Sequence, residues 1–310
     1  MMRHNCAGQS KCHENLGEEA ERQEKLADYW QPLDGQPMSV LCLLCPHLCR
    51  IAPGHAGICR VRVNRGGKLF ADAYAKVTSL ALDPIEKKPL HDFLRGSKIF
   101  SVGSYGCNFR CGYCQNWQIS QQEAAWQRID PEELIALAEE EKQHGNIGVA
   151  YTYNEPLINY EYVLDCARLA HAAHLKNVLV TNGSINSEPF QTLLPYIDAM
   201  NIDLKSWQDS FYKHFCGGAR DPVLETIRSA ARCSHVELTL LLIPGLNDHE
   251  RDLASLAEWV ASQDPMIVLH LTRHHPDYLM PRPPPITVER MKILADVARK
   301  HLHTVVLGNI

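Results

Sequence analysis

No apolar run in this chain of 310 residues approaches the length of a membrane span, and the N-terminus lacks the apolar core of a signal peptide. Blocks rich in lysine and arginine are also missing, and the net charge is −5. We therefore expect a cytoplasmic protein without a membrane partner, and the charge disfavours nucleic acid as its main partner. The hydrophobic content of 45% and the charged content of 22% are those of a globular protein rather than a disordered one.

Cysteine, by contrast, is abundant, with twelve residues. In a chain without export this number favours metal binding over disulfides. Cys107, Cys111 and Cys114 have a C-x3-C-x2-C spacing on the loop that leaves a strand predicted at 98–103. Three thiolates can hold three irons of a 4Fe–4S cluster and leave the fourth iron without a protein ligand. An open metal position is typical of catalytic sites, whereas structural zinc needs a fourth ligand, and none lies close by in sequence. Three buried thiols are the remaining alternative.

A second group of cysteines has the spacing C-x2-C-x3-C-x9-C. Its members are Cys42, Cys45, Cys49 and Cys59. Proline and glycine interrupt this segment, which has too few apolar residues to fold on a core of its own, so a bound metal would supply the missing stability. Four thiolates suit a zinc site or an auxiliary iron–sulfur cluster, and His47 or His55 could replace one of them. Unliganded thiols are the alternative, and the sequence does not decide between zinc and iron.

The chain divides into three predicted parts. Residues 1–37 form a polar segment with a helix over about 14–29, and residues 38–95 form a Cys-rich segment with a hairpin around Gly66-Gly67 and a linker at 83–90. Residues 96–310 alternate apolar strands with amphipathic helices, which indicates an α/β fold with a parallel sheet. Six such units suit a partial (β/α)6 TIM-type barrel better than the eight units of a closed one. The strands are expected near 98–103, 147–151, 177–181, 198–203, 236–243 and 266–271, with a weak one near 303–307.

Each of the six predicted strands ends in polar residues. On a β/α barrel the loops after the strands carry the functional groups, so these residues are expected to share one face. The first strand leads into the three cysteines, and the others lead into 151–156, 181–183, 203–205, 244–248 and 272–275. Six polar strand ends in register are hard to explain by turn chemistry alone. A structural ion pair remains the alternative interpretation of Asp203 and Lys205.

The cysteine spacing, with an aromatic residue directly before the last cysteine, resembles that of the radical S-adenosylmethionine (SAM) superfamily. The resemblance implies that Cys107, Cys111 and Cys114 bind a 4Fe–4S cluster whose open iron is chelated by the amino and carboxylate groups of SAM. One electron would then cleave SAM to methionine and a 5′-deoxyadenosyl radical, which would abstract hydrogen from a substrate. Tyr113 would pack against the adenine.

The charges of SAM suggest roles for the other strand-end residues. Glu155 would accept the SAM ammonium, with Asn154 beside it where the family usually has Gly-Gly-Glu. Lys205 would bind the SAM carboxylate or position the sulfonium, and Asp203 would need a cation partner, either Lys205 or a monovalent ion. We expect Asp203 and Lys205 to be the catalytic residues. Further candidates for contacts with the ribose, carboxylate or adenosine are Thr181, Asn182, His270, His274 and His275.

A closer resemblance rests on four motifs: Gly-Cys-Asn-x-x-Cys-x-Tyr-Cys-Gln-Asn, Thr-Asn-Gly, Asp-Leu-Lys and Pro-Gly-x-Asn-Asp. Together they resemble the branch that contains the pyruvate formate-lyase activating enzymes. The Cys42–Cys59 segment, residues 83–90 and Leu271–Tyr278 are most similar to the radical SAM enzymes of the AmmeMemoRadiSam system. The resemblance implies an oxidoreductase that acts on a protein or peptide and takes electrons from flavodoxin or ferredoxin. The alternatives are a non-catalytic iron–sulfur protein for electron transfer or sensing, and an RNA-modifying enzyme, which the charge balance disfavours.

Overall fold

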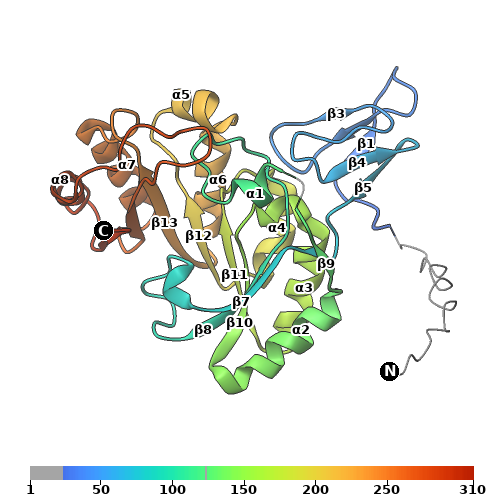
Figure 1. Cartoon of the computed structure of the whole chain (residues 1–310), viewed down its shortest axis with the longest axis horizontal. Helices are drawn as coiled ribbons and strands as arrows, with labels where there is room; N and C mark the ends of the chain where they lie inside the picture. Colours follow the sequence, from blue (N-terminus) through green and yellow to red (C-terminus); the bar gives the residue numbers. More distant parts are fainter. Residues whose placement is uncertain (1–23, 123) are drawn as a thin grey trace, which may run out of the picture.

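The main sheet has eight strands in the order β15-β14-β13-β12-β11-β10-β8-β7 (Figure 1). The computed structural model describes residues 24–122 and 124–310. Within them no pairing joins the edge strands β15 and β7, so the barrel stays open. β7 (Ser79–Pro84) pairs antiparallel with β8, and the other neighbours are parallel. The parallel strands are β8 (Lys98–Gly103), β10 (Asn146–Tyr151), β11 (Lys176–Thr181), β12 (Ala199–Asp203), β13 (His235–Leu242), β14 (Val268–Arg273) and β15 (Val305–Gly308). The predicted α/β partial barrel is confirmed.

Helices cover the outside of the curved sheet (Figure 1). The first long one, α2, begins with Pro131 and two acidic residues, which suit the N-terminal turn of a helix, and it buries Leu134 and Ile135. The last one, α8, is capped by Thr287, whose hydroxyl accepts a hydrogen bond from the Arg290 amide. The main helices are α2 (Pro131–Glu140), α3 (Tyr160–Ala172), α4 (Ser187–Leu193), α6 (Asp221–Ala230), α7 (Glu250–Gln263) and α8 (Val288–Ala298).

The segment after β7 closes one end of the barrel. Residues 83–90 were expected to form a linker, but Asp83 and Pro84 end a strand of the main sheet, and the residues that follow enter the core. Ile85 and Leu90 pack on Ile99 and its neighbours in the adjoining strands. The buried Glu237 carboxylate accepts hydrogen bonds from the backbone amides of residues 91 and 92, both at 2.8 Å. The linker prediction was wrong because prolines and charges suggested a loop, while the pairing with β8 was not visible in sequence.

The Cys-rich part forms two small antiparallel sheets beside the barrel (Figure 1). The predicted hairpin around Gly66-Gly67 is confirmed by β4 (Arg62–Arg65) and β5 (Lys68–Ala71). The other sheet consists of β1 (Trp30–Pro32), β2 (Val40–Cys42) and β3 (Arg50–Ile51). Of the helix predicted at 14–29, residues 14–23 lie outside the described residues. Residues 24–29 are not helical, because they pair with the hairpin through Leu26 and Phe70.

One buried ion pair joins these small sheets to the barrel. Arg62 of β4 and Glu161 of α3 are each 1% exposed, and their Nη1 and Oε1 atoms lie 2.9 Å apart. Segment 24–37 packs with the Cys-rich part through β1, and β7 belongs to the main sheet. The division at residues 37 and 95 stays a prediction.

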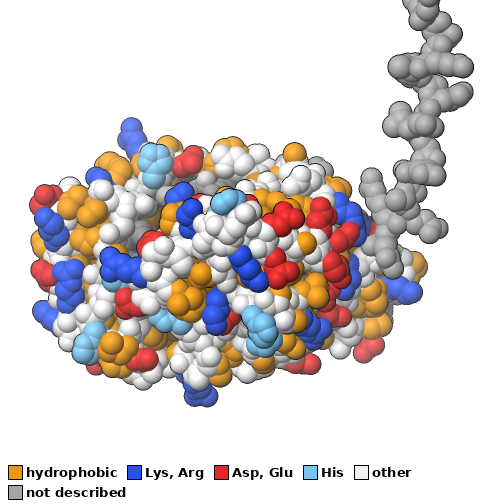
Figure 2. Space-filling model, turned by 90° about the horizontal axis from the view of Figure 1, so that it is seen from below, with side chains coloured by type: hydrophobic (Ala, Val, Ile, Leu, Met, Phe, Trp, Pro, Cys, Tyr) orange, Lys and Arg blue, Asp and Glu red, His pale blue; other side chains and the backbone are white. Residues whose placement is uncertain are grey.

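Neither the described helices nor the face drawn in Figure 2 points to a membrane or a nucleic acid as partner. Among the described helices, none combines the length and the apolar character that crossing a bilayer requires. Figure 2 shows one face of the molecule, on which Lys and Arg side chains are interspersed with acidic, hydrophobic and neutral ones. No broad single-sign patch of the kind that steers nucleic acid is visible on that face.

Candidate active site

The cysteine loop after β8 opens into a cavity of about 400 Å³ at the carboxyl ends of the strands. Cys107, Cys111 and Cys114 all line it. Gly106 has a φ of +85°, and a Cβ there would lie 2.7 Å from the carbonyl oxygen of Cys59, so the tight entry to the loop needs glycine. The predicted cofactor residues that line the same cavity are Tyr113, Asn154, Glu155, Thr181, Asn182, Asp203 and Lys205. The structure therefore brings together residues from four strand ends.

The three thiols differ in their surroundings. The Cys107 sulfur accepts hydrogen bonds from the Phe109 amide at 3.3 Å and from Asn182 Nδ2 at 3.7 Å. Burial raises the pKa of Cys107 and of Cys114, whereas a hydrogen bond from the Cys216 thiol lowers the pKa of Cys111. Because burial disfavours a free thiolate, at least two of these sulfurs need a bound cation to ionise readily.

A 4Fe–4S cluster fits this donor set. All three thiols are free, and they share one cavity. Among the residues that the structure describes, no three His, Cys, Asp or Glu side chains converge closely enough to hold a single metal ion. A cluster does not require such convergence, because each cysteine binds a different iron. The arrangement is therefore better suited to a cluster than to one zinc ion.

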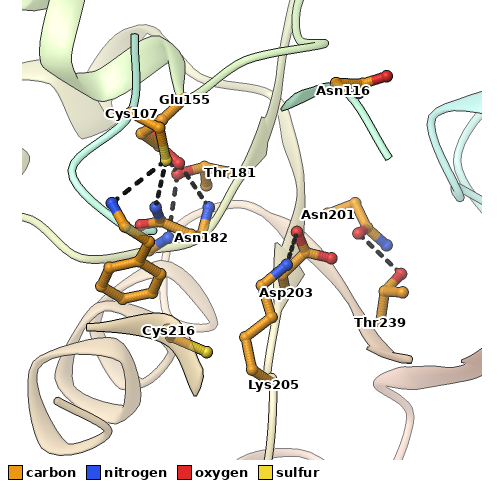
Figure 3. Close-up of polar contacts among 12 residues, drawn as sticks. Cys107, Asn116, Glu155, Thr181, Asn182, Asn201, Asp203, Lys205, Cys216 and Thr239 are labelled. Atoms are coloured by element: carbon orange, nitrogen blue, oxygen red, sulfur yellow. Dashed lines mark hydrogen bonds and ion pairs between the residues drawn. The ribbon is translucent and has the colours of Figure 1, made fainter. Parts of the chain in front are cut away.

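Glu155 is a buried carboxylate on the cavity wall that accepts three hydrogen bonds (Figure 3). Its Oε1 accepts hydrogen bonds from the Thr181 hydroxyl at 2.6 Å and the Leu157 amide at 3.0 Å, and its Oε2 accepts one from the Asn182 amide at 2.7 Å. Burial raises the pKa of Glu155 to about 7 despite these donors. A carboxylate offers about four acceptor positions, so Oε2 retains one for a further donor.

Asn154 serves the cysteine loop more than the open cavity. Its Nδ2 donates to the carbonyl oxygens of Tyr105 and Gly106, both at 3.1 Å, and its Oδ1 accepts from the Ser104 amide at 3.0 Å. These bonds hold the start of the loop against the end of β10. The Asn154 side chain thus helps to fix the backbone of the cysteine loop.

Asp203 and Lys205 form an ion pair with Nζ and Oδ2 2.6 Å apart (Figure 3). Burial alone would lower the pKa of Lys205, but the adjacent Asp203 carboxylate raises it overall, so the ammonium stays charged. Both residues line the cavity. The two residues therefore form the ion pair that was the alternative interpretation. The lysine also lies where it can contact an anionic ligand in the cavity.

The histidines predicted near the adenosine lie elsewhere. His270 is on the barrel floor, where its Nε2 lies 2.5 Å from Glu237 Oε2. His274 and His275 line an adjoining cavity rather than the main one. The sequence correctly placed His270 within this strand and His274 and His275 after it, but it could not show how the loop turns.

The structure adds residues that the sequence did not single out. Tyr153 has a φ of +71°, and its hydroxyl donates to Asp83 Oδ2 at 2.7 Å, while Lys88 Nζ lies 2.8 Å from the same oxygen. Lys87 and Pro89 line the cavity beside them. The charged residues of 83–90 could have indicated this contact with the cavity, although the sequence analysis predicts a linker there.

Cys216 is a second addition, because its buried sulfur lies 3.2 Å from the Tyr113 hydroxyl. Nothing in its local sequence marks it. Tyr113 is itself 3% exposed and packs against Phe211, so only part of its ring faces the cavity.

The four cysteines of the Cys-rich part are all free thiols. Cys42, Cys45 and Cys59 are buried, and Cys49 is half-buried. Burial raises the pKa of Cys45 to about 12 and that of Cys59 to about 11, and repulsion from the neighbouring thiols adds to both. In the described part of the chain they do not converge on one metal position. The structure thus brings the four thiols near one another, and their role as metal ligands stays a prediction.

Comparison with known proteins agrees with this site. The model of the radical SAM superfamily matches residues 101–257. An uncharacterized protein of Methanocaldococcus jannaschii is 39% identical over 290 residues, which cover 92% of this chain and 85% of that protein. The 4-hydroxyphenylacetate decarboxylase activating enzyme of Clostridium scatologenes is 24% identical over 131 residues, 41% of this chain and 42% of that enzyme. The chain thus spans less than half of that relative.

Among solved structures, Streptococcus suis SuiB bound to S-adenosylmethionine has a TM-score of 0.52 at 12% identity, over 66% of this chain and 48% of SuiB. At that identity the likeness concerns the fold alone.

Proposed function

The chain belongs to the radical SAM superfamily and is related to glycyl-radical activating enzymes, and from this premise we propose that Cys107, Cys111 and Cys114 hold a 4Fe–4S cluster that binds SAM. The observation that carries the proposal is the sharing of one cavity by the three thiols, the buried Glu155 and the Asp203–Lys205 pair. A reduced cluster held by these cysteines would supply the electron that cleaves SAM, and the 5′-deoxyadenosyl radical so formed would take a hydrogen atom from the substrate.

The residues of the chain bind and orient SAM. Glu155 accepts the SAM ammonium at the free position of Oε2, and the hydrogen bonds from Thr181 and Asn182 fix its carboxylate. Lys205 meets the SAM carboxylate, and Asp203 holds the lysine side chain in place. His274, which we expected to contact SAM, lies on the wall of the adjoining cavity, so we assign it no part in SAM binding.

The substrate that we propose is a protein or peptide, with flavodoxin or ferredoxin as the reductant. The support is the similarity to an activating enzyme and the absence of a broad basic patch on the face in Figure 2. The finer proposal is a glycyl-radical activase, or an enzyme of the AmmeMemoRadiSam type that modifies a partner of that system. The support for the latter is the resemblance of residues 83–90 to those enzymes. In the structure, Asp83 and Lys88 of this segment join Tyr153 in one bonded group beside the cavity.

We further propose that the four cysteines of the Cys-rich part bind a second metal, zinc or an auxiliary cluster. The support is their mutual proximity, together with the close contact between Cys59 and Gly106 of the cysteine loop. Metal analysis and absorption spectra of the variant that lacks Cys107, Cys111 and Cys114 test it. Zinc or residual iron at one site per chain supports the proposal, and a metal-free protein opposes it.

The main proposal is tested by anaerobic reconstitution with iron and sulfide, followed by dithionite and SAM. We expect 5′-deoxyadenosine, and its formation should be lost in Cys114→Ala but retained in Cys233→Ala, a matched change at an exposed cysteine outside the cavity. A glycyl radical in an added partner, detected by electron paramagnetic resonance, would select the activase. A reconstituted protein that yields no 5′-deoxyadenosine with any reductant contradicts the proposal.

A further inference from the structure

A second cavity, of about 470 Å³, adjoins the proposed SAM pocket. The two share Gln115, directly after the last cysteine of the loop, and Asn309 near the C-terminus. The loop after β14 forms the far wall and is held over the cysteine loop. Tyr278 stacks on Trp117 with ring centroids 5.1 Å apart, and the Leu279 amide donates to the Gly112 carbonyl oxygen at 3.0 Å. A molecule in this cavity would therefore lie beside the reaction site.

His274 on the wall of this cavity has unmet hydrogen-bonding capacity. The residue is 1% exposed, and neither ring nitrogen has a hydrogen-bond partner among the described residues. Burial lowers its pKa, so the ring is neutral and offers one N–H donor and one acceptor. Buried polar groups are nearly always paired, so an unpaired imidazole at a cavity wall indicates that a ligand completes it.

Arg273 supplies a positive charge at the same cavity. Its Nε donates to the Ile286 carbonyl oxygen at 2.7 Å, while its two terminal nitrogens have no partner in the part of the chain that the structure describes. A guanidinium fork of this kind matches a carboxylate in a bidentate arrangement. Asp277 also lines the cavity, with Oδ1 bonded to the amide of Tyr278 at 2.6 Å and Oδ2 left to accept another N–H.

We infer that this second cavity binds a peptide segment of the substrate that carries a carboxylate, with Arg273 and His274 on the carboxylate and Asp277 on a backbone amide. The side-chain amides of Gln115 and Asn309 can pair with further peptide groups. The polypeptide nature of the ligand rests on the proposed function. The carboxylate preference rests on the cavity alone.

Saturation-transfer NMR of small probes on the anaerobically purified full chain tests this inference. Nα-acetylglutamate amide should bind saturably and at least tenfold more tightly than Nα-acetylglutamine amide, which has nearly the same shape without the charge. Arg273→Gln should weaken glutamate-probe binding at least tenfold, and His274→Phe severalfold. Arg228→Gln, at an exposed arginine paired with Glu225 on α6, should leave it unchanged. If Arg273→Gln does not fold, Arg273→Lys, which keeps the charge and loses the fork, should weaken binding at least threefold.

Three outcomes overturn the inference. Equal binding of the two probes removes the carboxylate preference, and displacement of the glutamate probe by equimolar inorganic phosphate indicates a phosphate ligand. Binding that is lost in Lys205→Met but kept in Arg273→Gln would place the probe in the SAM pocket. The titration involves neither SAM nor electrons, so its failure leaves the proposed radical chemistry standing. A lack of 5′-deoxyadenosine, in turn, leaves the carboxylate site standing.

Discussion

Glu155→Gln is the substitution that separates the SAM-binding role of this carboxylate from its structural one. In the wild type, Oε1 accepts from the Leu157 amide and Oε2 from the Asn182 amide, in addition to the Thr181 hydroxyl. Glutamine has only one acceptor oxygen, so one backbone N–H loses its partner, at a cost of about 1–3 kcal/mol in the free energy of unfolding. The loss of the charge-assisted bond to the SAM ammonium should cost a further ~1.5–3 kcal/mol, which weakens SAM binding roughly 10- to 150-fold.

Equilibrium dialysis of labelled SAM against reconstituted protein measures the binding, and urea unfolding measures the stability. Glu237→Gln is the matched control, because Glu237 is a buried carboxylate that also accepts two backbone amides yet does not line the cavity. It should lower the free energy of unfolding at least as much, because Glu237 also bonds the rings of His235 and His270, while the dissociation constant of SAM stays unchanged. Glu155→Gln with wild-type SAM affinity would refute the assigned role, as would an equal loss of affinity in both variants.

Two further predictions concern charge. Arg62→Met leaves the buried Glu161 without its cation and should lower the free energy of unfolding in urea by about 3–5 kcal/mol. Lys142→Met, in an exposed pair, should lower it by less than about 1 kcal/mol. Equal losses in the two variants would contradict the importance of the buried pair. Because burial raises the pKa of Glu155 to about 7, this carboxyl is mostly protonated at pH 6 in the SAM-free protein and must ionise to bind an ammonium. SAM affinity should therefore rise nearly tenfold per pH unit from about pH 5.5 to 6.5 and level off above about pH 8. A flat dialysis profile in the wild type would oppose this reasoning.

The fold was largely predictable from sequence where the signal is local. Apolar runs marked the parallel strands, with a shift of two residues at β14, and Gly66-Gly67 marked the hairpin. The failures involve partners distant in the chain. The segment 24–29 was expected to be helical but pairs with a hairpin some forty residues later. The predicted linker 83–90 supplies the end of β7 and two residues that pack under the sheet, Ile85 and Leu90.

For the candidate site, too, local signals were readable in the sequence and contacts between distant segments were not. Motif spacing and strand ends identified residues that share one cavity, because parallel strands bring their carboxyl ends to one edge. Motifs could not reveal Tyr153 bonded to Asp83, or Cys216 against Tyr113, since these contacts join separate segments. The position of His274 could not be predicted either, because it depends on a loop that the stacking of Tyr278 on Trp117 holds in place.

The central claim is that the cluster bound by Cys107, Cys111 and Cys114 keeps one iron open for SAM. Electron paramagnetic resonance of the dithionite-reduced, reconstituted protein, recorded with and without saturating SAM, tests it most directly. The account predicts that SAM changes the spectrum of the reduced cluster in the wild type. It also predicts that the change is much weaker at the same SAM concentration in Glu155→Gln. A reduced-cluster spectrum that is identical with and without SAM would contradict the claim and favour a non-catalytic iron–sulfur protein.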